Sequence, residues 1–135
     1  MVRRRVPAHT AVMQVFLVED SPLVRDRLIA LLGGLPDVEL LGHASDAETA
    51  IREILVARPD VVLLDLALSE GSGFDVLRAV HPLDPRIDFY MLSNFDAYPY
   101  RQLAGKLGVR GFFDKTKEFE RVRDVIVERA SAVRH

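Results

Sequence analysis

Short apolar runs alternate with longer amphipathic stretches along most of the chain. A run such as residues 15–18, apolar at every position, is typical of a strand buried on both faces of a parallel sheet. Apolar residues that recur every three or four positions indicate helices instead. This pattern predicts strands at residues 14–18, 38–44, 61–66, 87–92 and 111–113, and helices at 22–33, 45–57, 74–80, 99–108 and 118–133.

Capping residues and helix breakers mark the ends of these helices. Ser21 or Asp20 can cap the first helix, and Pro22 suits its first turn, where the missing N–H has no helical partner. Ser45 with Glu48 matches a capping box for the second helix. The first helix is expected to bury Leu23, Leu28, Leu31, Leu32 and Leu35, and the last helix Phe119, Val122, Val125, Ile126 and Ala130.

Five strand–helix units in succession predict an α/β fold, in which helices cover both faces of a parallel sheet. We expect one domain over residues 13–135, preceded by a short disordered arm over residues 1–12 that carries three arginines. No repeat, linker or low-complexity segment indicates a second domain. A stand-alone domain is therefore expected.

The composition narrows the function classes. The chain has 135 residues and a formal net charge of −2, which does not favour a nucleic-acid binder. The absence of cysteine excludes disulfides, thiolate catalysis and cysteine-based zinc sites. No apolar run reaches the length that a bilayer-spanning helix needs. We therefore expect a cytoplasmic protein that binds neither nucleic acid nor a membrane.

Polar side chains follow several of the predicted strands, at the sheet edge where open α/β proteins bind ligands. Glu19 and Asp20 follow the first strand, and Asp65 lies near the end of the third. Ser93 follows the fourth strand and Lys115 the fifth. Because the carboxyl ends of parallel strands meet at one edge, three carboxylates, a hydroxyl and an ammonium group are expected to converge there.

These groups suit a divalent cation and phosphoryl transfer. Three carboxylates in a partly desolvated site repel one another, and a divalent cation relieves that repulsion. Ligands that are all oxygen favour Mg²⁺ over zinc. A carboxylate can attack phosphorus to form an acyl phosphate. Ser93 and Lys115 can then stabilise the transferred oxygens, by a hydrogen bond and a positive charge respectively.

The residues at these strand ends resemble the receiver domains of two-component response regulators. The resemblance extends over about residues 14–133 and depends on the order of the motifs as much as on each one. The motifs lie at residues 15–20, 61–66 with the following Gly73, 92–94 and 113–115.

The resemblance implies a flavodoxin-like fold with the strand order 2-1-3-4-5. It implies that Asp65 accepts the phosphoryl group and that Glu19 and Asp20, together with Asp65, bind Mg²⁺. Ser93 takes the place of the switch hydroxyl, and Lys115 that of the family's lysine.

Four positions depart from the usual receiver pattern. Thr116 follows the lysine where a proline in a cis bond is common, so a cis bond there is in doubt. Asn94, rather than a small residue, follows the switch hydroxyl. The loop at residues 68–73 lacks the common Pro-Gly pair, and Phe113 stands at the aromatic switch position that is elsewhere often tyrosine.

The resemblance predicts a signalling switch rather than a turnover enzyme. The phosphoryl group would come from a histidine kinase or a histidine phosphotransfer protein. Phosphorylation would draw Ser93 inward and let Phe113 rotate, which changes the face made by the fourth helix, the fifth strand and the fifth helix. Output would pass through protein contacts, including a homodimer through that face.

The same fold also serves other functions, among them docking modules and phosphatases. A pseudo-receiver docking module, which works without phosphorylation, usually lacks the acceptor, an acidic residue or the lysine, and this chain has all of them. A phosphatase of the aspartyl-phosphate type would have a second aspartate where Ala67 stands.

Two apolar side chains are expected to prolong the life of the phosphoryl group. In receiver domains, the residues two beyond the acceptor and two beyond the switch hydroxyl flank the approach of the hydrolytic water. These residues are Ala67 and Phe95, and neither can orient a water molecule by hydrogen bonding.

Overall fold

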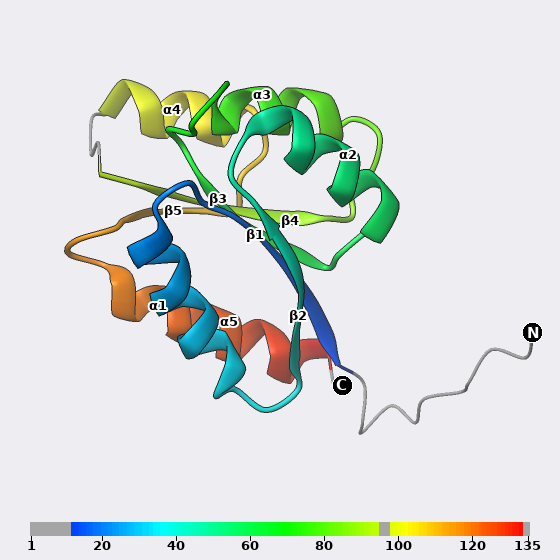
Figure 1. Ribbon diagram of the computed structural model, residues 1–135, viewed down its shortest axis with the longest axis vertical. Coiled ribbons are helices and arrows are strands. Elements are labelled where there is room, and N and C mark those ends of the chain that lie inside the picture. The colour runs from blue at the N-terminus through cyan, green and yellow to red at the C-terminus, as the bar shows by residue number, and fades with distance from the viewer. Residues whose placement is uncertain (1–11, 95–97, 134–135) are drawn as a thin grey trace, which may run out of the picture.

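Five parallel strands form a single sheet in the computed structural model, which describes residues 12–94 and 98–133 (Figure 1). The strands are β1 (Met13–Val18), β2 (Val38–Ala44), β3 (Val61–Asp65), β4 (Asp88–Ser93) and β5 (Gly111–Asp114). Their order across the sheet is β2-β1-β3-β4-β5, which confirms the flavodoxin-like fold predicted from the sequence. Most of the expected arm and Phe95 lie outside the described residues.

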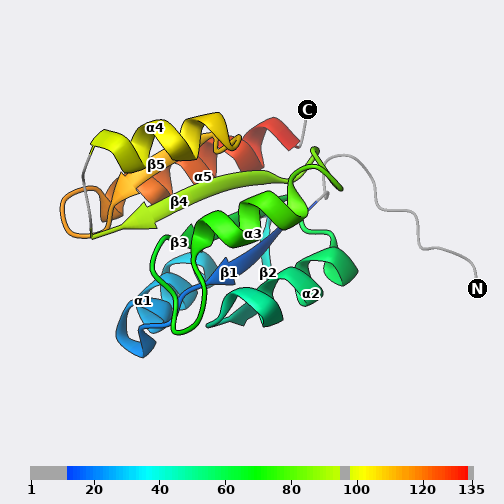
Figure 2. The same cartoon turned by 90° about the horizontal axis from the view of Figure 1, so that it is seen from above.

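Helices cover both faces of the sheet, as Figures 1 and 2 show. The helices are α1 (Pro22–Gly33), α2 (Ala47–Ala57), α3 (Gly73–Val80), α4 (Tyr98–Lys106) and α5 (Phe119–Val133). α1 and α5 lie on one face, and α2, α3 and α4 lie on the other. Over the described residues, no helix combines the length and apolarity needed to cross a membrane.

Two apolar layers, one on each side of the sheet, hold the fold together. Val15 and Leu17 point toward α1 and α5, whereas Phe16 and Val18 point toward the other helices. This alternation follows from the period of two along a strand. Two of the three inner strands, β1 and β3, are apolar on both faces because helices cover both faces of the sheet. The strands therefore hold their carboxyl ends rigidly at one edge.

Element ends differ from the predicted ones by at most two residues, and the chemistry of the helix starts explains one difference. Ser21 caps α1 as expected, since its hydroxyl accepts from the Val24 N–H. The capping box predicted at Ser45 and Glu48 is wrong. Asp46 caps α2, with its carboxylate 3.0 Å from the Thr49 N–H donor. An aspartate can accept this bond as well as a serine, and it stands one position nearer the helix.

One expectation about helix packing is wrong, and one helix cap was not predicted. Leu23, expected on the buried face of α1, is 74% exposed, whereas Leu28 and Leu32 are buried. Leu23 lies five residues before Leu28, about 140° round a helix of 3.6 residues per turn, and therefore faces away from the buried side. A capping box that the sequence analysis missed opens α3, where Ser72 and Asp75 each accept from the other's backbone N–H.

The loop between β3 and α3 is tightly packed around two glycines. A Cβ on Gly73 would lie 2.5 Å from the backbone oxygen of Asp65. Gly71 has φ +78° and sits against the side chain of Ala47 at the start of α2. The Glu70 carbonyl accepts from the Ala47 N–H at 3.0 Å, so this loop is tied to α2. Asp65 therefore begins a loop with little freedom to move.

A matched pair of glycine substitutions should have opposite effects on stability. Gly73→Ala should lower the free energy of unfolding by about 1–3 kcal/mol, because the new methyl group meets backbone and not a flexible side chain. Gly105→Ala, in the last turn of α4 with open space around it, should raise that free energy by roughly 0.5–1 kcal/mol. Urea unfolding followed by circular dichroism measures both. Equal stability of the two variants would contradict the close packing at Gly73.

Candidate functional site

The carboxyl ends of β1, β3 and β5 bring three charged side chains into contact. Lys115 Nζ donates to Asp65 Oδ2 at 2.8 Å and to Glu19 Oε2 at 2.9 Å. All three side chains are buried, and Glu19 is fully so. A backbone hydrogen bond from Glu19 to Ala44 prolongs the pairing of β1 with β2 and holds Glu19 at this edge. The convergence predicted from the strand ends is therefore present.

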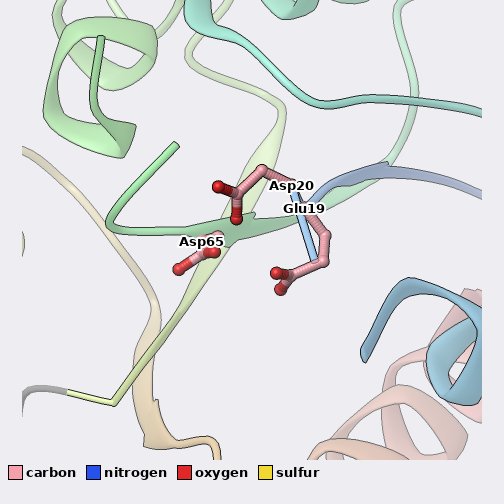
Figure 3. A group of neighbouring side chains, drawn as sticks. All are labelled: Glu19, Asp20 and Asp65. Atoms are coloured by element: carbon pink, nitrogen blue, oxygen red, sulfur yellow. The ribbon is translucent and has the colours of Figure 1, made fainter. Parts of the chain in front are cut away.

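Asp20 completes an acidic cluster with Glu19 and Asp65. One carboxylate oxygen from each of the three residues lies within 4.8 Å of the other two. Figure 3 shows the three side chains grouped at the ends of their strands. Asp20 is only half-buried, so the cluster is open to solvent on its side. A cation could therefore reach these oxygens without any rearrangement of the sheet.

An unpaired oxygen shows that this cluster fits a metal ion. Glu19 Oε2 accepts from Lys115 and from the Ser21 N–H, whereas Glu19 Oε1 is buried and has no hydrogen-bond partner among the described residues. A buried carboxylate oxygen without a partner is costly. When ionised, the three carboxylates of the cluster against one ammonium leave an excess of two negative charges. Oxygen ligands and this charge suit a hard divalent cation.

Burial raises the pKa of Asp65 to about 7. The hydrogen bond from Lys115 opposes this rise, while the negative charge of Glu19 adds to it. Burial alone would lower the pKa of Lys115, but its bonds to Asp65 and Glu19 outweigh that effect and raise the pKa above its ordinary value. Lys115 therefore keeps its positive charge. A cation beside Asp65 would favour the ionised carboxylate.

Ser93 ends β4 at the same edge and is almost fully buried. Asp65 pairs with Leu92 in the register of β3 and β4, so Ser93 lies one residue beyond that pair. Its carbonyl accepts from the Lys115 N–H at 2.9 Å, which joins the backbones of the hydroxyl and the lysine. The structure thus places all five predicted site residues at one edge of the sheet.

The turn that carries Lys115 is held by side chains that the sequence analysis did not select. Asp114 Oδ1 accepts from the N–H groups of Thr116 and Lys117, at 2.8 and 2.9 Å. The N–H group of Lys117 is the main cause, and that of Thr116 the next, of a pKa of Asp114 below its usual range. Aspartate commonly accepts from the backbone two residues ahead, and that habit was the available signal. In the described part of the chain every peptide bond is trans, including the one before Thr116.

A backbone group next to Asp65 also belongs to the site. The Ala67 N–H donates to Asp65 Oδ1 at 3.3 Å, and Ala67 itself is exposed. Side-chain chemistry gave no reason to select an alanine, because the donor is its main chain. Phe95, the other residue expected near the acceptor, falls outside the described ranges.

Phe113 lies behind the site, on the face of the sheet that α1 and α5 cover. It is buried, and its ring centroid is 6.2 Å from that of Tyr90. Movement of this ring remains a prediction.

Comparisons with known proteins agree with this geometry. The sequence model of the family described as response regulator receiver domain matches residues 15–127. The chain is 33% identical over 86 residues to the sensory transduction protein LytT of Bacillus cereus, covering 64% of this chain and 35% of that protein. It is 34% identical over 83 residues to the DNA-binding transcriptional activator DevR/DosR of Mycobacterium tuberculosis, covering 62% of this chain and 38% of that protein.

A solved structure extends the likeness over almost the whole chain. The signal receiver domain of the response regulator NarL from Mycobacterium tuberculosis has a TM-score of 0.81 and 25% identity, covering 90% of this chain and 98% of that chain. The chain spans little more than a third of the length of the two curated relatives named above. The matched residues include the whole acidic cluster, the strands β2 to β5 and all but the first two residues of β1. The chain therefore belongs to the response regulator receiver domain family of two-component signalling.

Proposed function

We propose that this domain is a phosphoacceptor switch, in which Asp65 takes a phosphoryl group from a phosphohistidine in an Mg²⁺-dependent reaction. The observation that supports it best is the buried carboxylate of Asp65, bonded to Lys115 inside a cluster with excess negative charge. A histidine kinase or a histidine phosphotransfer protein would be the donor. Such a donor implies that the domain works in the cytoplasm.

The transfer forms one bond and breaks another. A carboxylate oxygen of Asp65 attacks the phosphorus, and the bond from phosphorus to the histidine nitrogen breaks. The electron pair of that bond stays on the imidazole, which takes up a proton. Lys115 Nζ, already 2.8 Å from Asp65 Oδ2, can bind a phosphoryl oxygen as a positive charge. The Ala67 N–H, which already contacts Asp65, and the Ser93 hydroxyl, at the end of the neighbouring strand, would donate to others.

Glu19, Asp20 and Asp65 are the residues that would hold Mg²⁺. When bound, the ion supplies positive charge against the phosphoryl oxygens and the carboxylates. Without it, the chain's own counter-charge in this cluster is Lys115. The half-buried position of Asp20 leaves a path for the ion from solvent.

The product is a covalent state of the domain itself, which is why we propose a switch and not a turnover enzyme. Ser93 would turn toward the new phosphoryl group, and Phe113 would move into the space behind it. Such a change shifts the population between two packings. Its output would pass through the face made by α4, β5 and α5, to a partner protein or to a second copy.

Acetyl phosphate with Mg²⁺ should modify the protein once, at Asp65. Intact-mass measurement should show one phosphoryl adduct in the wild type, and none in Asp65→Asn or in excess EDTA. Asp26→Asn, which changes an exposed carboxylate on α1, is the matched control and should keep the adduct. An adduct that persists in Asp65→Asn would place the site elsewhere. No adduct in the wild type would favour a phosphorylation-independent docking module.

Asp20→Ala should weaken Mg²⁺ binding more than it alters the fold. The change removes one carboxylate from the cluster, and with it an attraction of about 1–4 kcal/mol, or roughly fivefold to several hundredfold in affinity. It also removes repulsion from Glu19 and Asp65, so the metal-free variant should melt no lower than the wild type. Calorimetric titration with Mg²⁺ and thermal melts measure both effects, with Asp26→Ala as the control. Unchanged affinity in Asp20→Ala would contradict the metal role.

Ala67→Asn should shorten the lifetime of phosphorylated Asp65. An amide side chain at this exposed position beside Asp65 can orient a water molecule, and such help is typically worth roughly 10²–10⁴-fold at most. Loss of the adduct over time in Mg²⁺ buffer measures the rate. Ala57→Asn, at the exposed end of α2, is the control and should match the wild type. If Ala67→Asn decays no faster, this side chain does not control water access.

A further inference from the structure

The outer edge of β5 lies at one side of the sheet and offers backbone groups to a partner protein. β5 is the last strand in the sheet order, and within the described ranges no strand pairs with its outer side. An edge strand leaves backbone N–H and C=O groups without ladder partners, and such groups can pair with another chain. The question is therefore which groups of this chain bond the N–H and C=O groups on the outer side of β5.

Two charged side chains bond two of the backbone groups of this edge, and the Asp114 carbonyl accepts from the Glu118 N–H at 2.9 Å. Arg101 Nη1, from α4, donates to the Phe112 carbonyl at 3.1 Å. Glu118 Oε1 accepts from the Asp114 N–H at 3.0 Å. The two side chains also meet each other, since Arg101 Nη2 lies 3.4 Å from Glu118 Oε1. An ion-paired arginine and glutamate therefore bond the Phe112 carbonyl and the Asp114 N–H.

Arg101 and Glu118 make the two hydrogen bonds that one residue of an added parallel strand would make. In a parallel pair, a residue donates to the carbonyl before its neighbour and accepts from the N–H after it. A sixth strand with a residue opposite Phe113 would use the Phe112 carbonyl and the Asp114 N–H. Arg101 supplies the donor and Glu118 the acceptor that such a residue would bring. These two backbone groups are therefore bonded by the side chains of Arg101 and Glu118, which the backbone of another chain could replace.

A positively charged hollow of about 320 Å³ runs beside this edge. Three arginines line it, namely Arg101, Arg110 and Arg121, against the single carboxylate of Glu118. Arg110 also pairs with Asp88, which Arg129 contacts as well, so four arginines stand against two carboxylates around the hollow. The excess is +2, on a chain whose formal net charge is −2. Arg110 and Arg121 are well exposed, at 61% and 66% of their side chains. An anionic ligand is therefore favoured here.

We infer that the outer edge of β5 binds an acidic, extended segment of a partner protein by strand addition. The segment's own N–H and C=O would replace Arg101 and Glu118 on Phe112 and Asp114, so that no backbone group loses a partner. A carboxylate of the segment would then replace Glu118 as the partner of Arg101. Others would meet Arg110 and Arg121. Figure 2 shows α4 and α5 flanking β5 at this side of the sheet.

The inference rests on the proposed function only in taking this face as the output surface. Nothing in the edge itself requires phosphorylation, so the test uses the unphosphorylated full chain. Failure to bind the probe would then leave the phosphorylation of Asp65 untouched. Failure to phosphorylate Asp65 would likewise leave the binding measurement interpretable.

The test is an NMR titration with three synthetic eight-residue peptides. The first alternates glutamate with valine, the second alternates lysine with valine, and the third repeats the acidic sequence with alternate backbone nitrogens methylated. The acidic peptide should shift the amide signals of Phe112 and Asp114 and protect them from hydrogen exchange. The lysine and methylated peptides should not, because one lacks the charge and the other the donors.

Single substitutions test how much the charged side chains of the hollow contribute to binding of the acidic peptide. Arg121→Gln should weaken binding of the acidic peptide by roughly two- to fivefold, as expected for one exposed charge pair. Arg123→Gln is the matched control, because Arg123 lies on the same helix, is 53% exposed and does not line the hollow. It should leave the affinity unchanged. Glu118→Gln should tighten binding, since it removes the carboxylate that competes for Arg101. Thermal melts check that each variant is folded.

Several results would overturn the inference. Equal binding of the methylated peptide would show a charged surface without strand addition. Equal binding of the lysine peptide would remove the acidic specificity. A single-stranded oligonucleotide of the same charge that binds more tightly than the peptide would assign the surface to nucleic acid. Formation of a dimer that excludes the peptide, seen by sedimentation, would assign the surface to a second copy.

Discussion

The buried ammonium of Lys115, shared by two buried carboxylates, is the interaction on which the rest of this site depends. It joins residues 96 and 50 positions apart in the sequence, and so ties together the ends of β1, β3 and β5. Burying these charges is costly, and the cost is offset only because the pairing distances are short. Removing either carboxylate would leave the buried ammonium with a single carboxylate partner. Removing the lysine would leave two carboxylates facing each other.

The sheet and this cluster could be predicted because both depend on backbone periodicity. Four consecutive apolar residues in β1 and β3 indicated strands covered on both faces, and five alternating units indicated parallel pairing. Parallel strands bring their carboxyl ends to one edge, whatever the details of packing. Glu19, Asp65 and Lys115 were therefore expected at the same edge, and the strand order that the receiver resemblance implied placed them within reach of one another.

The details that escaped prediction depend on side-chain direction and on main-chain donors. Leu23 was grouped with the buried leucines of α1, but it lies about 140° round the helix from Leu28 and therefore remains exposed. Ser45 and Asp46 were both able to cap α2, and only the path of the chain decides between them. The Ala67 N–H was invisible in the sequence because every residue except proline carries such a donor.

Asp114, the last residue of β5, contacts both the turn that carries Lys115 and the outer edge of the sheet. The carboxylate of Asp114 closes the turn that carries Lys115, and its N–H is one of the two edge groups bonded by side chains. Glu118 accepts from that N–H and also contacts Arg101 on α4. The turn and the edge therefore share one residue, Asp114, whose carboxylate bonds the turn and whose N–H bonds the edge. A partner that holds the Asp114 N–H would thus bind next to the turn from which Lys115 reaches the acceptor.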